Sequence, residues 1–505
     1  MNNHKTNGNV SANITLKRHD MYLGIDLGTS GVKVIILNDN DTLIAQASAA
    51  LEVSIPQPLW SEQNPQHWWQ ATNDAIAELK SKYPQELLAI KAIGLSGQMH
   101  GATLLDDNND IIRPAILWND GRSQQQCIEI EKRQPNSRNI TGNIAMPGFT
   151  APKLLWIAQN EPELFARVNK VLLPKDYLRF LMTGDFASDM SDSAGTLWLD
   201  VENRQWSSEM LAVTGLNESH MPKLYEGTEV TGILTADIAA NWGMKQVPVA
   251  AGAGDNAAGA AGIGVINPNE AFLSLGTSGV YFVANEAYKP NPDSAVHTFC
   301  HCVPNTWHQM AVVLSAASCL SWVTKLTDFA DEKTLLDDVE KLDFSTPSSV
   351  MFLPYLSGER TPHNNPHAQG VFFGLGHNTG AAELCRAVLE GIAFAFADGQ
   401  QALVAAGTKI DQVSVIGGGS RSKLWGKILA SVLNKPLTYR KGGEVGPALG
   451  AARLAKIGVN KLNVSDVCIA SEVDHVIEPQ QQMTNYYPAQ HLKYQQLYQS
   501  LKEHF

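Results

Sequence analysis

The sequence predicts two α/β domains that face each other across a cleft. A length of 505 residues is too great for one ordinary hydrophobic core, so two or three domains are expected. A pentapeptide repeats, because Leu27 to Gly31 (LGTSG) recurs unchanged at Leu275 to Gly279. Between β-prone segments lie helical patterns such as residues 68–79 and 381–404, an alternation typical of α/β domains.

Both copies of the pentapeptide lie between apolar, β-prone segments. These segments are residues 22–25 and 32–37 for the first copy, and 272–273 and 280–283 for the second. Each copy therefore predicts a β-hairpin with a tight glycine-rich turn that opens a domain. Chance recurrence is the alternative, but an identical string in matching context favours duplication. Two similar domains face to face would place the two turns on opposite walls of one cleft.

The expected boundaries follow from the repeat. Residues 1–20 are polar and lack the apolar stretch of a signal peptide, so they are predicted to be a disordered extension. The first domain is expected at 21–265 and the second at 271–458. Residues 459–505 are expected to form a helical tail, which ends in a polar helix rich in Gln and Tyr.

Composition excludes several classes of protein. Hydrophobic residues at 44% and charged residues at 17% are typical of a soluble globular chain. A net charge of −12 argues against a nucleic-acid surface, and no run of about 18 apolar residues predicts a membrane span. The six cysteines are sparse, which favours the reducing cytoplasm. The oligomeric state stays open, with a homodimer as one option.

The two turns differ in one residue that carries charge. Asp26 closes the strand before the first turn, and Ser274 occupies the same place before the second. A carboxylate there can hold a hard cation such as Mg²⁺, directly or through water, while turn amides and hydroxyls face phosphate oxygens. This asymmetry suits phosphoryl transfer, with one turn for the metal and the other for the distal phosphates. Ordinary hairpin chemistry is the alternative for a single GTSG turn.

A second candidate site is the acid-amide pair Asp255-Asn256 within the small-residue run 251–260. Residues this small do not block an approaching ligand. The alternative is that Asp255 only N-caps an Ala-rich helix, and the two readings are compatible. An Asp with its ordinary pKa of about 3.9 is expected to be ionised at neutral pH and able to accept a proton.

Three further strings have structural alternatives. Residues 413–420 predict a buried strand that ends in a glycine loop against which a flat ring could lie, although the string by itself favours a plain strand-to-helix turn. His100, in the loop 97–101, can contact a sugar hydroxyl or can be a structural histidine. Residues 297–302 (HTFCHC) do not predict a zinc site, because no second ligand pair follows at finger spacing.

Together these residues resemble the actin-like ATPase superfamily and, within it, the FGGY carbohydrate kinases. Two family signatures lie far apart, residues 150–156 (TAPKLLW) and 370–391, and the resemblance spans residues 21–455. Residues 60–63, 98–101 and 117–122 are similar to the family members that phosphorylate D-xylulose. Glycerol kinases carry an Arg-Glu pair near the second of these strings.

The resemblance implies two ribonuclease-H-like domains with ATP and sugar in the cleft between them. It implies transfer of a phosphoryl group from ATP to D-xylulose, with Mg²⁺ as the metal. Ribulose, gluconate or glycerol are alternative acceptors, and a conformational ATPase is an alternative of another class. The base would be Asp255, and the sugar contacts would be Met99, His100, Asp255 and Asn256. The ATP contacts would be Thr29, Ser30, Lys33, Gly276, Thr277, Gly417, Gly418 and Ser422, with Asp26 on the metal side.

Overall fold

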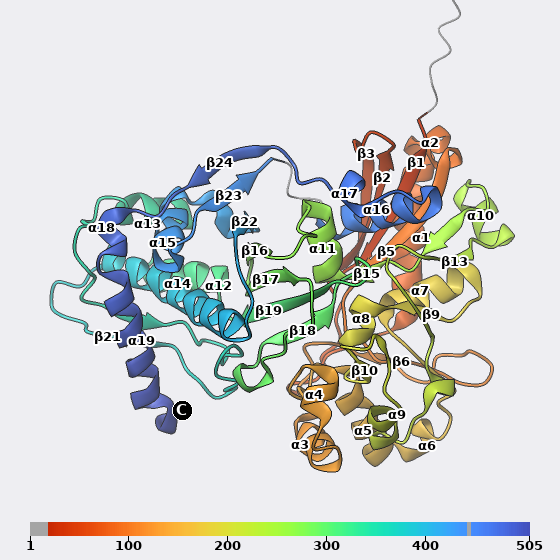
Figure 1. Cartoon of the computed structure of the whole chain (residues 1–505), viewed down its shortest axis with the longest axis horizontal. Coiled ribbons are helices and arrows are strands. Elements are labelled where there is room, and N and C mark those ends of the chain that lie inside the picture. The colour runs from red at the N-terminus through yellow and green to blue at the C-terminus, as the bar shows by residue number, and fades with distance from the viewer. Residues whose placement is uncertain (1–18, 442–445) are drawn as a thin grey trace, which may run out of the picture.

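A computed structural model describes residues 19–441 and 446–505 (Figure 1). Most of the predicted extension, residues 1–18, lies outside the described residues. The chain folds around two seven-stranded mixed sheets, one in each half of the molecule. Within the described ranges, no helix combines the length and hydropathy needed to cross a bilayer.

The first sheet contains the first LGTSG turn. Its spatial order is β13 (Val230–Ile233), β14 (Pro248–Ala250), β5 (Ile90–Gly97), β1 (Met21–Leu27), β2 (Gly31–Asn38) and β3 (Leu43–Ala50). The short strand β15 (Ala253–Gly254) also pairs with β5. β1, β5, β14 and β15 run parallel, so their carboxyl ends meet at one edge of the sheet.

The second sheet contains the second turn. Its order is β18 (His297–Cys300), β19 (Trp307–Val313), β17 (Gly279–Asn285), β16 (Glu270–Leu275), β22 (Gln412–Ile416), β23 (Leu437–Arg440) and β24 (Val473–Ile477). From β24 to β19, its six strands repeat the order and orientation of β13 to β3 in the first sheet. The two predicted hairpins are therefore confirmed as equivalent positions of one repeated topology.

Helices cover both sheets. The predicted helices at 68–79 and 381–404 are α1 (Pro65–Lys82) and α14 (Ala381–Ala405). α19 (Tyr487–Leu501), in the expected polar tail, buries Tyr487, Tyr494 and Tyr498 in the core of the second half. This helix is therefore polar on only part of its surface, because its tyrosine rings pack together on the core-facing side.

A lobe of helices separates β5 from β14 in the sequence and supports the site. Its helices are α3 (Gln124–Arg133), α5 (Thr150–Asn160), α7 (Pro174–Thr183), α8 (Met190–Ala194) and α9 (Ser208–Val213). Phe149 from this lobe shares one hydrophobic cluster with Phe282 and Phe299 of the second sheet. The lobe therefore packs on both halves of the molecule.

The last helix of the expected second domain packs on the first sheet. α16 (Gly446–Asn460) lies over β1 and β5 and against α11 (Asp255–Ile263), as Figure 1 shows. Glycines allow these contacts, because a Cβ at Gly24, Gly94 or Gly450 would lie within about 2 Å of a backbone carbonyl oxygen of the opposing helix. The sequence boundary at 458 groups α16 with the second domain, although its packing partners belong to the first.

The helix pair α11–α16 offers a matched test of this close packing. A Cβ at Gly450 would lie 1.9 Å from the carbonyl oxygen of Ala258, whereas a Cβ at Gly259 would meet its nearest atom at 3.9 Å. We expect Gly450→Ala to lower the free energy of unfolding by about 1–3 kcal/mol or more, because of overpacking. Gly259→Ala should be neutral or stabilising by up to about 1 kcal/mol, because alanine favours a helix. Equal unfolding midpoints for the two variants would contradict the tight contact.

Candidate active site

Three loops that are far apart in the sequence meet at one edge of the first sheet. β1 ends at Leu27, β5 at Gly97 and β15 at Gly254, and Gly97 is the Cα partner of both Leu27 and Gly254. Loops that follow parallel strands at such an edge commonly form ligand sites. The structure therefore brings together the expected residues Asp26, Met99, His100, Asp255 and Asn256.

Asp26 lies near the end of β1, opposite Lys33 on β2 and Ser96 on β5. Its Oδ1 is buried and has no hydrogen-bond partner among the described residues. Burial raises the pKa of Asp26 to about 6, and the positive charge of Lys33 limits the rise. An orphaned carboxylate oxygen at this position can accept a ligand, a metal ion or a water molecule.

Asp255 is the first residue of α11, and the helix is capped by Gly254, so Asp255 is not the N-cap that the sequence allowed. Its Oδ1 accepts hydrogen bonds from the backbone amide of Asn256 at 2.7 Å and from Asn256 Nδ2 at 2.8 Å. Burial raises the pKa of Asp255 to about 7, and the neighbouring negative charge of Asp26 adds to the rise. At neutral pH the carboxyl is thus only partly ionised, which corrects the expectation from its ordinary pKa.

His100 has a left-handed backbone conformation with φ of 71°. Its Nδ1 donates to the carbonyl oxygen of Gly195 at 2.6 Å. Burial lowers the pKa of His100 to about 3, so the ring is neutral and Nε2 is left as an acceptor. Met99 is buried and packs beside Gly254, where a Cβ would lie 2.9 Å from Met99 Cγ. His100 therefore has one structural nitrogen, and its other nitrogen has no hydrogen bond to the described chain.

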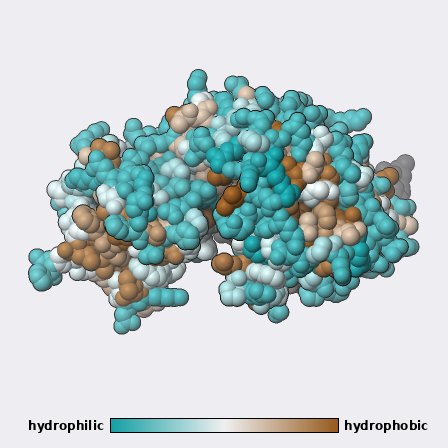
Figure 2. Space-filling view, turned by 90° about the horizontal axis from the view of Figure 1, so that it is seen from below, coloured by the Kyte–Doolittle hydropathy of each residue, from teal (hydrophilic) through white to brown (hydrophobic). Residues whose placement is uncertain are grey.

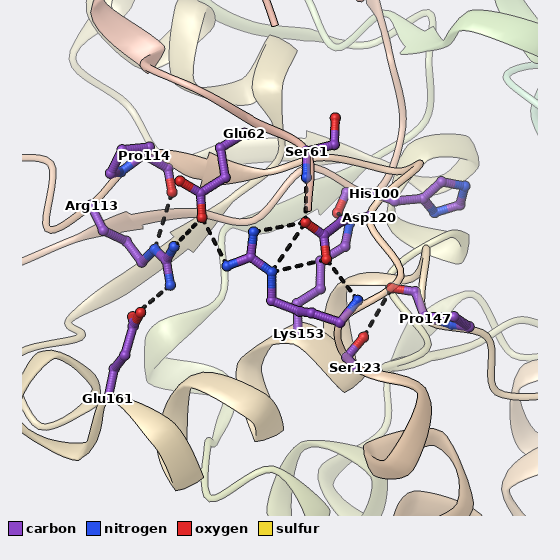
Figure 3. Close-up of polar contacts among 11 residues, drawn as sticks. Ser61, Glu62, His100, Arg113, Pro114, Asp120, Ser123, Pro147, Lys153 and Glu161 are labelled. Carbon is purple, nitrogen blue, oxygen red and sulfur yellow. Dashed lines mark hydrogen bonds and ion pairs between the residues drawn. The ribbon is translucent and has the colours of Figure 1, made fainter. Parts of the chain in front are cut away.

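A buried polar network contacts the backbone of the loop that contains His100 (Figure 3). Lys153 Nζ donates to the carbonyl oxygen of His100 at 2.9 Å, and Thr150 Oγ1 donates to the same oxygen at 3.1 Å. Burial lowers the pKa of Lys153 well below its usual value. Sequence reasoning used residues 150–156 only as a family signature and missed this contact. The signal was the polar pair Thr150 and Lys153 within an otherwise apolar helix.

The same network joins two of the strings on which the resemblance to family members that phosphorylate D-xylulose rests. Asp120 Oδ2 accepts from the Ser61 amide at 2.6 Å, and the Arg122 guanidinium forms ion pairs with Asp120 and Glu62 (Figure 3). Arg122 also lies 3.6 Å from the centre of the Trp60 ring. The strings 60–63 and 117–122 are therefore joined by buried polar contacts, while Trp118 is exposed.

The first LGTSG turn is held by the same region. Thr29 Oγ1 accepts from Trp118 Nε1 at 2.9 Å and donates to Gln98 Oε1 at 3.1 Å. The Thr29 carbonyl oxygen accepts from Gln63 Nε2 at 2.7 Å. Ser30, next to it, is exposed. The first turn is thus hydrogen-bonded to Gln98 and to residues of the strings 60–63 and 117–122.

The second LGTSG turn is hydrogen-bonded to the backbone at the start of a helix. The carbonyl oxygens of Gly276 and Thr277 accept from Ala317 and Ala316 at the start of α12 (Ala317–Leu326). The glycine loop lies next to it, since a Cβ at Gly417 would be 2.8 Å from the Leu275 carbonyl oxygen. The expected ATP residues Gly276, Thr277 and Gly417 therefore gather at the end of β16.

Two cavities flank the glycine loop. A cavity of about 710 Å³ lies between α12, α13 (Glu332–Val339) and this loop, and its lining includes Ala317, Leu320, Leu336, Gly418 and Ser422. A second cavity of about 780 Å³ includes Ile263 from the first half of the chain and Ser274, Gly417 and Gly418 from the second. The space-filling view shows the surface hollowed between the two halves (Figure 2).

Ser422 also has a structural role. Its hydroxyl caps α15 (Lys423–Leu433) by accepting a hydrogen bond from the Trp425 amide at 3.2 Å. The helix begins directly after this serine, at Lys423. Of the expected ATP residues, Gly417 lines one cavity and Ser422 the other, whereas Gly418, like Arg421, lines both.

Comparison with known proteins places this geometry in a family. Residues 21–262 match the N-terminal domain, and residues 271–459 the C-terminal domain, of the FGGY family of carbohydrate kinases. A xylulose kinase of Escherichia coli K12 is 58% identical over 87% of this chain and 90% of its own length.

Solved structures agree with this result. A xyloylose kinase from Brucella ovis is 50% identical, covers 96% of this chain and 100% of its own, and superposes with a TM-score of 0.93. A xylulose kinase from Rhodospirillum rubrum is 28% identical, covers 96% of this chain and 99% of its own, and has a TM-score of 0.89. The chain therefore belongs to the FGGY family of carbohydrate kinases, with the actin-like, two-domain fold and the ATP-dependent sugar kinase activity of that family.

Proposed function

We propose that this enzyme transfers the γ-phosphoryl group of ATP to a primary hydroxyl of D-xylulose, giving D-xylulose 5-phosphate. The observation that carries the proposal is the 58% identity with the E. coli xylulose kinase over most of both chains. A neutral His100 and an acidic Asp255, which follow paired strands at one edge of the first sheet, support the proposal chemically. Ribulose, gluconate and glycerol are the competing acceptors.

Asp255 is proposed as the base. Phosphoryl transfer depends mainly on positioning and on charge stabilisation. Because Oδ1 of Asp255 already accepts two hydrogen bonds from Asn256, its Oδ2 is the oxygen that would receive the proton of the sugar hydroxyl. The pKa of about 7 is close to the working pH, where a general base is most effective. Met99, His100 and Asn256 are proposed to orient the sugar around it.

A Mg²⁺ ion fits the part of this site that contains Asp26. Among the described residues, no group of three or more His, Cys, Asp or Glu could hold a metal by itself. Mg²⁺ typically uses one or two carboxylates together with waters and substrate phosphates, and the orphaned Oδ1 of Asp26 suits that arrangement. When bound, the ion would neutralise phosphate charge. Asp26 is proposed to hold it directly or through water.

ATP is proposed to extend from the two turns to the glycine loop. Thr29, Ser30, Lys33, Gly276 and Thr277 would lie along the phosphates. The adenosine would occupy the cavity between α12, α13 and the glycine loop, because that cavity combines Gly418 and Ser422 with apolar side chains of the kind that cover a base. Gly417 would then support the glycine loop and would not contact the adenine ring.

The domain boundaries 21–265 and 271–458, the cytoplasmic location and a homodimer remain proposals. The six free cysteines, all buried in the described chain, support a reducing compartment.

An acceptor panel tests the proposed function. With D-xylulose, D-ribulose, gluconate and glycerol in an ADP-coupled assay, we expect D-xylulose to have the highest kcat/KM by a wide margin. Asp255→Asn should lower kcat by about 10²–10⁴ while leaving ADP binding intact, because only the base is lost. A higher kcat/KM for gluconate or glycerol would reject the proposed acceptor and leave the kinase family assignment untouched.

The raised pKa of Asp255 predicts a pH dependence. Only the ionised carboxylate can accept a proton, so kcat/KM for the sugar should rise with pH and level off above the pKa of about 7. Below that pKa the rise should approach about tenfold per pH unit. A rate that is constant from about pH 5.5 to pH 8, measured with excess coupling enzyme, would contradict an essential carboxylate with this pKa.

The adenosine cavity is tested at Gly418. A Cβ at this position meets no protein atom within 4 Å, so Gly418→Val would fill ligand space without a steric clash. We expect the KM for ATP to rise about tenfold or more, since a blocked contact of about 1.4 kcal/mol is a factor of ten. The KM for the sugar should change little. Gly376→Val is the matched control, because a Cβ there is equally free and Gly376 does not line the cavity. Equal ATP affinities for the two variants would remove the adenosine from this cavity.

A further inference from the structure

The short helix α8 contacts both loops of the acceptor site, one with each end. At its start, Ser191 Oγ accepts a hydrogen bond from the amide of Gly254, the residue before Asp255, at 3.1 Å. Just after its end, the Gly195 carbonyl oxygen accepts the hydrogen bond from His100 Nδ1 at 2.6 Å. The helix spans Met190–Ala194, and its residues from Ser191 to Ala194 are buried. It therefore links the proposed base to the proposed sugar-binding histidine.

Each contact has a defined direction. Ser191 Oγ donates its own proton to Asp189 Oδ2 at 2.5 Å, so its lone pairs are available to the Gly254 amide. The Gly195 carbonyl can only accept, so it places the proton of His100 on Nδ1 and leaves Nε2 as an acceptor. A Cβ at Gly195 would lie 2.6 Å from His100 Cε1 and 2.8 Å from Met99 Cε, so the helix end touches the sugar loop without room for a side chain.

A buried ion cluster anchors this helix. Lys175 Nζ lies 2.6 Å from Asp176 Oδ1, 2.8 Å from Asp189 Oδ1 and 3.3 Å from Asp192 Oδ2, and all four side chains are at most 1% exposed. Asp189 is also the N-cap of α8, with its Oδ2 accepting from the amides of Ser191 and Asp192. A buried cluster of this kind adds little net stability, but disturbing one member is costly, so it holds one arrangement.

The cluster also lies under the strand ends of the site. A Cβ at Gly97 would be 3.1 Å from Lys175 Cβ, and Gly97 pairs with Gly254 in the sheet. The same lysine therefore packs beneath β5, which leads to His100, and β15, which leads to Asp255. None of these four charged residues is expected to contact ATP or sugar.

We propose that α8, fixed by the cluster of Lys175, Asp176, Asp189 and Asp192, is the positioning element of the acceptor site. It sets the separation and orientation of Asp255 and His100, and Ser191 is its positioning residue toward the base. This inference rests on the proposed function, since it assumes that both residues face the sugar. Misplacement of a reacting group by about 1 Å can cost about 10²-fold in rate. The effect of α8 should thus fall on sugar phosphorylation and leave the nucleotide site unchanged.

The test compares Ser191→Ala with Ser193→Ala. Both serines are buried on α8, but the Ser193 hydroxyl donates to Ser188 Oγ at 2.9 Å and contacts neither loop of the site. With D-xylulose and ATP, and with rates normalised to the fraction of protein that binds ADP, we expect Ser191→Ala to lower kcat/KM for the sugar about 10- to 100-fold. The KM for ATP should stay within about twofold. Ser193→Ala should keep wild-type kinetics.

Other results separate the possible failures. Equal kinetics of the two variants, or a Ser191→Ala protein that loses ATP and sugar affinity together or does not fold, would overturn the positioning role. Asp189→Asn, which keeps an N-cap but removes a charge, should shift kcat/KM for the sugar in the same direction. If the wild-type enzyme phosphorylates an acceptor other than D-xylulose, the proposed sugar is wrong. The comparison of Ser191→Ala with Ser193→Ala then uses that acceptor and still tests the positioning role of α8.

Discussion

The site depends on one constraint of the first sheet, the parallel pairing of β1 and β15 with β5. Gly97 is the Cα partner of both Leu27 and Gly254, so the residues that follow these three positions must leave the sheet at the same edge. Asp26, His100 and Asp255 come from separate regions of the sequence, and this pairing brings them to the same edge. Because Gly97 and Gly254 carry no Cβ atom, the side chains of Lys175 and Met99 can pack closely against them.

Charge is arranged around this edge by burial. Two carboxyls, Asp26 and Asp255, share a poorly solvated space in which burial raises the pKa of both, and the negative charge of Asp26 adds to the rise at Asp255. Their pKa values of about 6 and 7 are the physical consequence. A cation beside Asp26 would relieve that repulsion and so favour the ionised base. At the loop that contains His100, burial lowers the pKa values of His100 and Lys153, which disfavours a positive charge on either side chain.

The two halves of the chain share a topology but differ in how they are supported. The first turn is tied to Gln98, Gln63 and Trp118, whereas the second rests on the amides of α12. α16 returns from the second sheet to pack on the first, so it joins the halves covalently and through glycine-mediated contacts. The residues proposed for the acceptor site belong to one half, and the glycine loop with the cavity beside α12 and α13 to the other.

The sequence by itself determined the repeat, both hairpins, the strand before the glycine loop and the helices at 65–82 and 381–405, because alternating and helical hydrophobic patterns are local properties. It also singled out Asp26, Asp255 and His100 by motif. Only the tertiary structure decided the pKa of Asp255, since that depends on burial and on Asp26, which is remote in sequence. The same holds for the roles of Lys153, Ser191 and Gly195, whose partners lie 53, 63 and 95 residues away. No local pattern encodes such contacts, because packing alone brings their partners together.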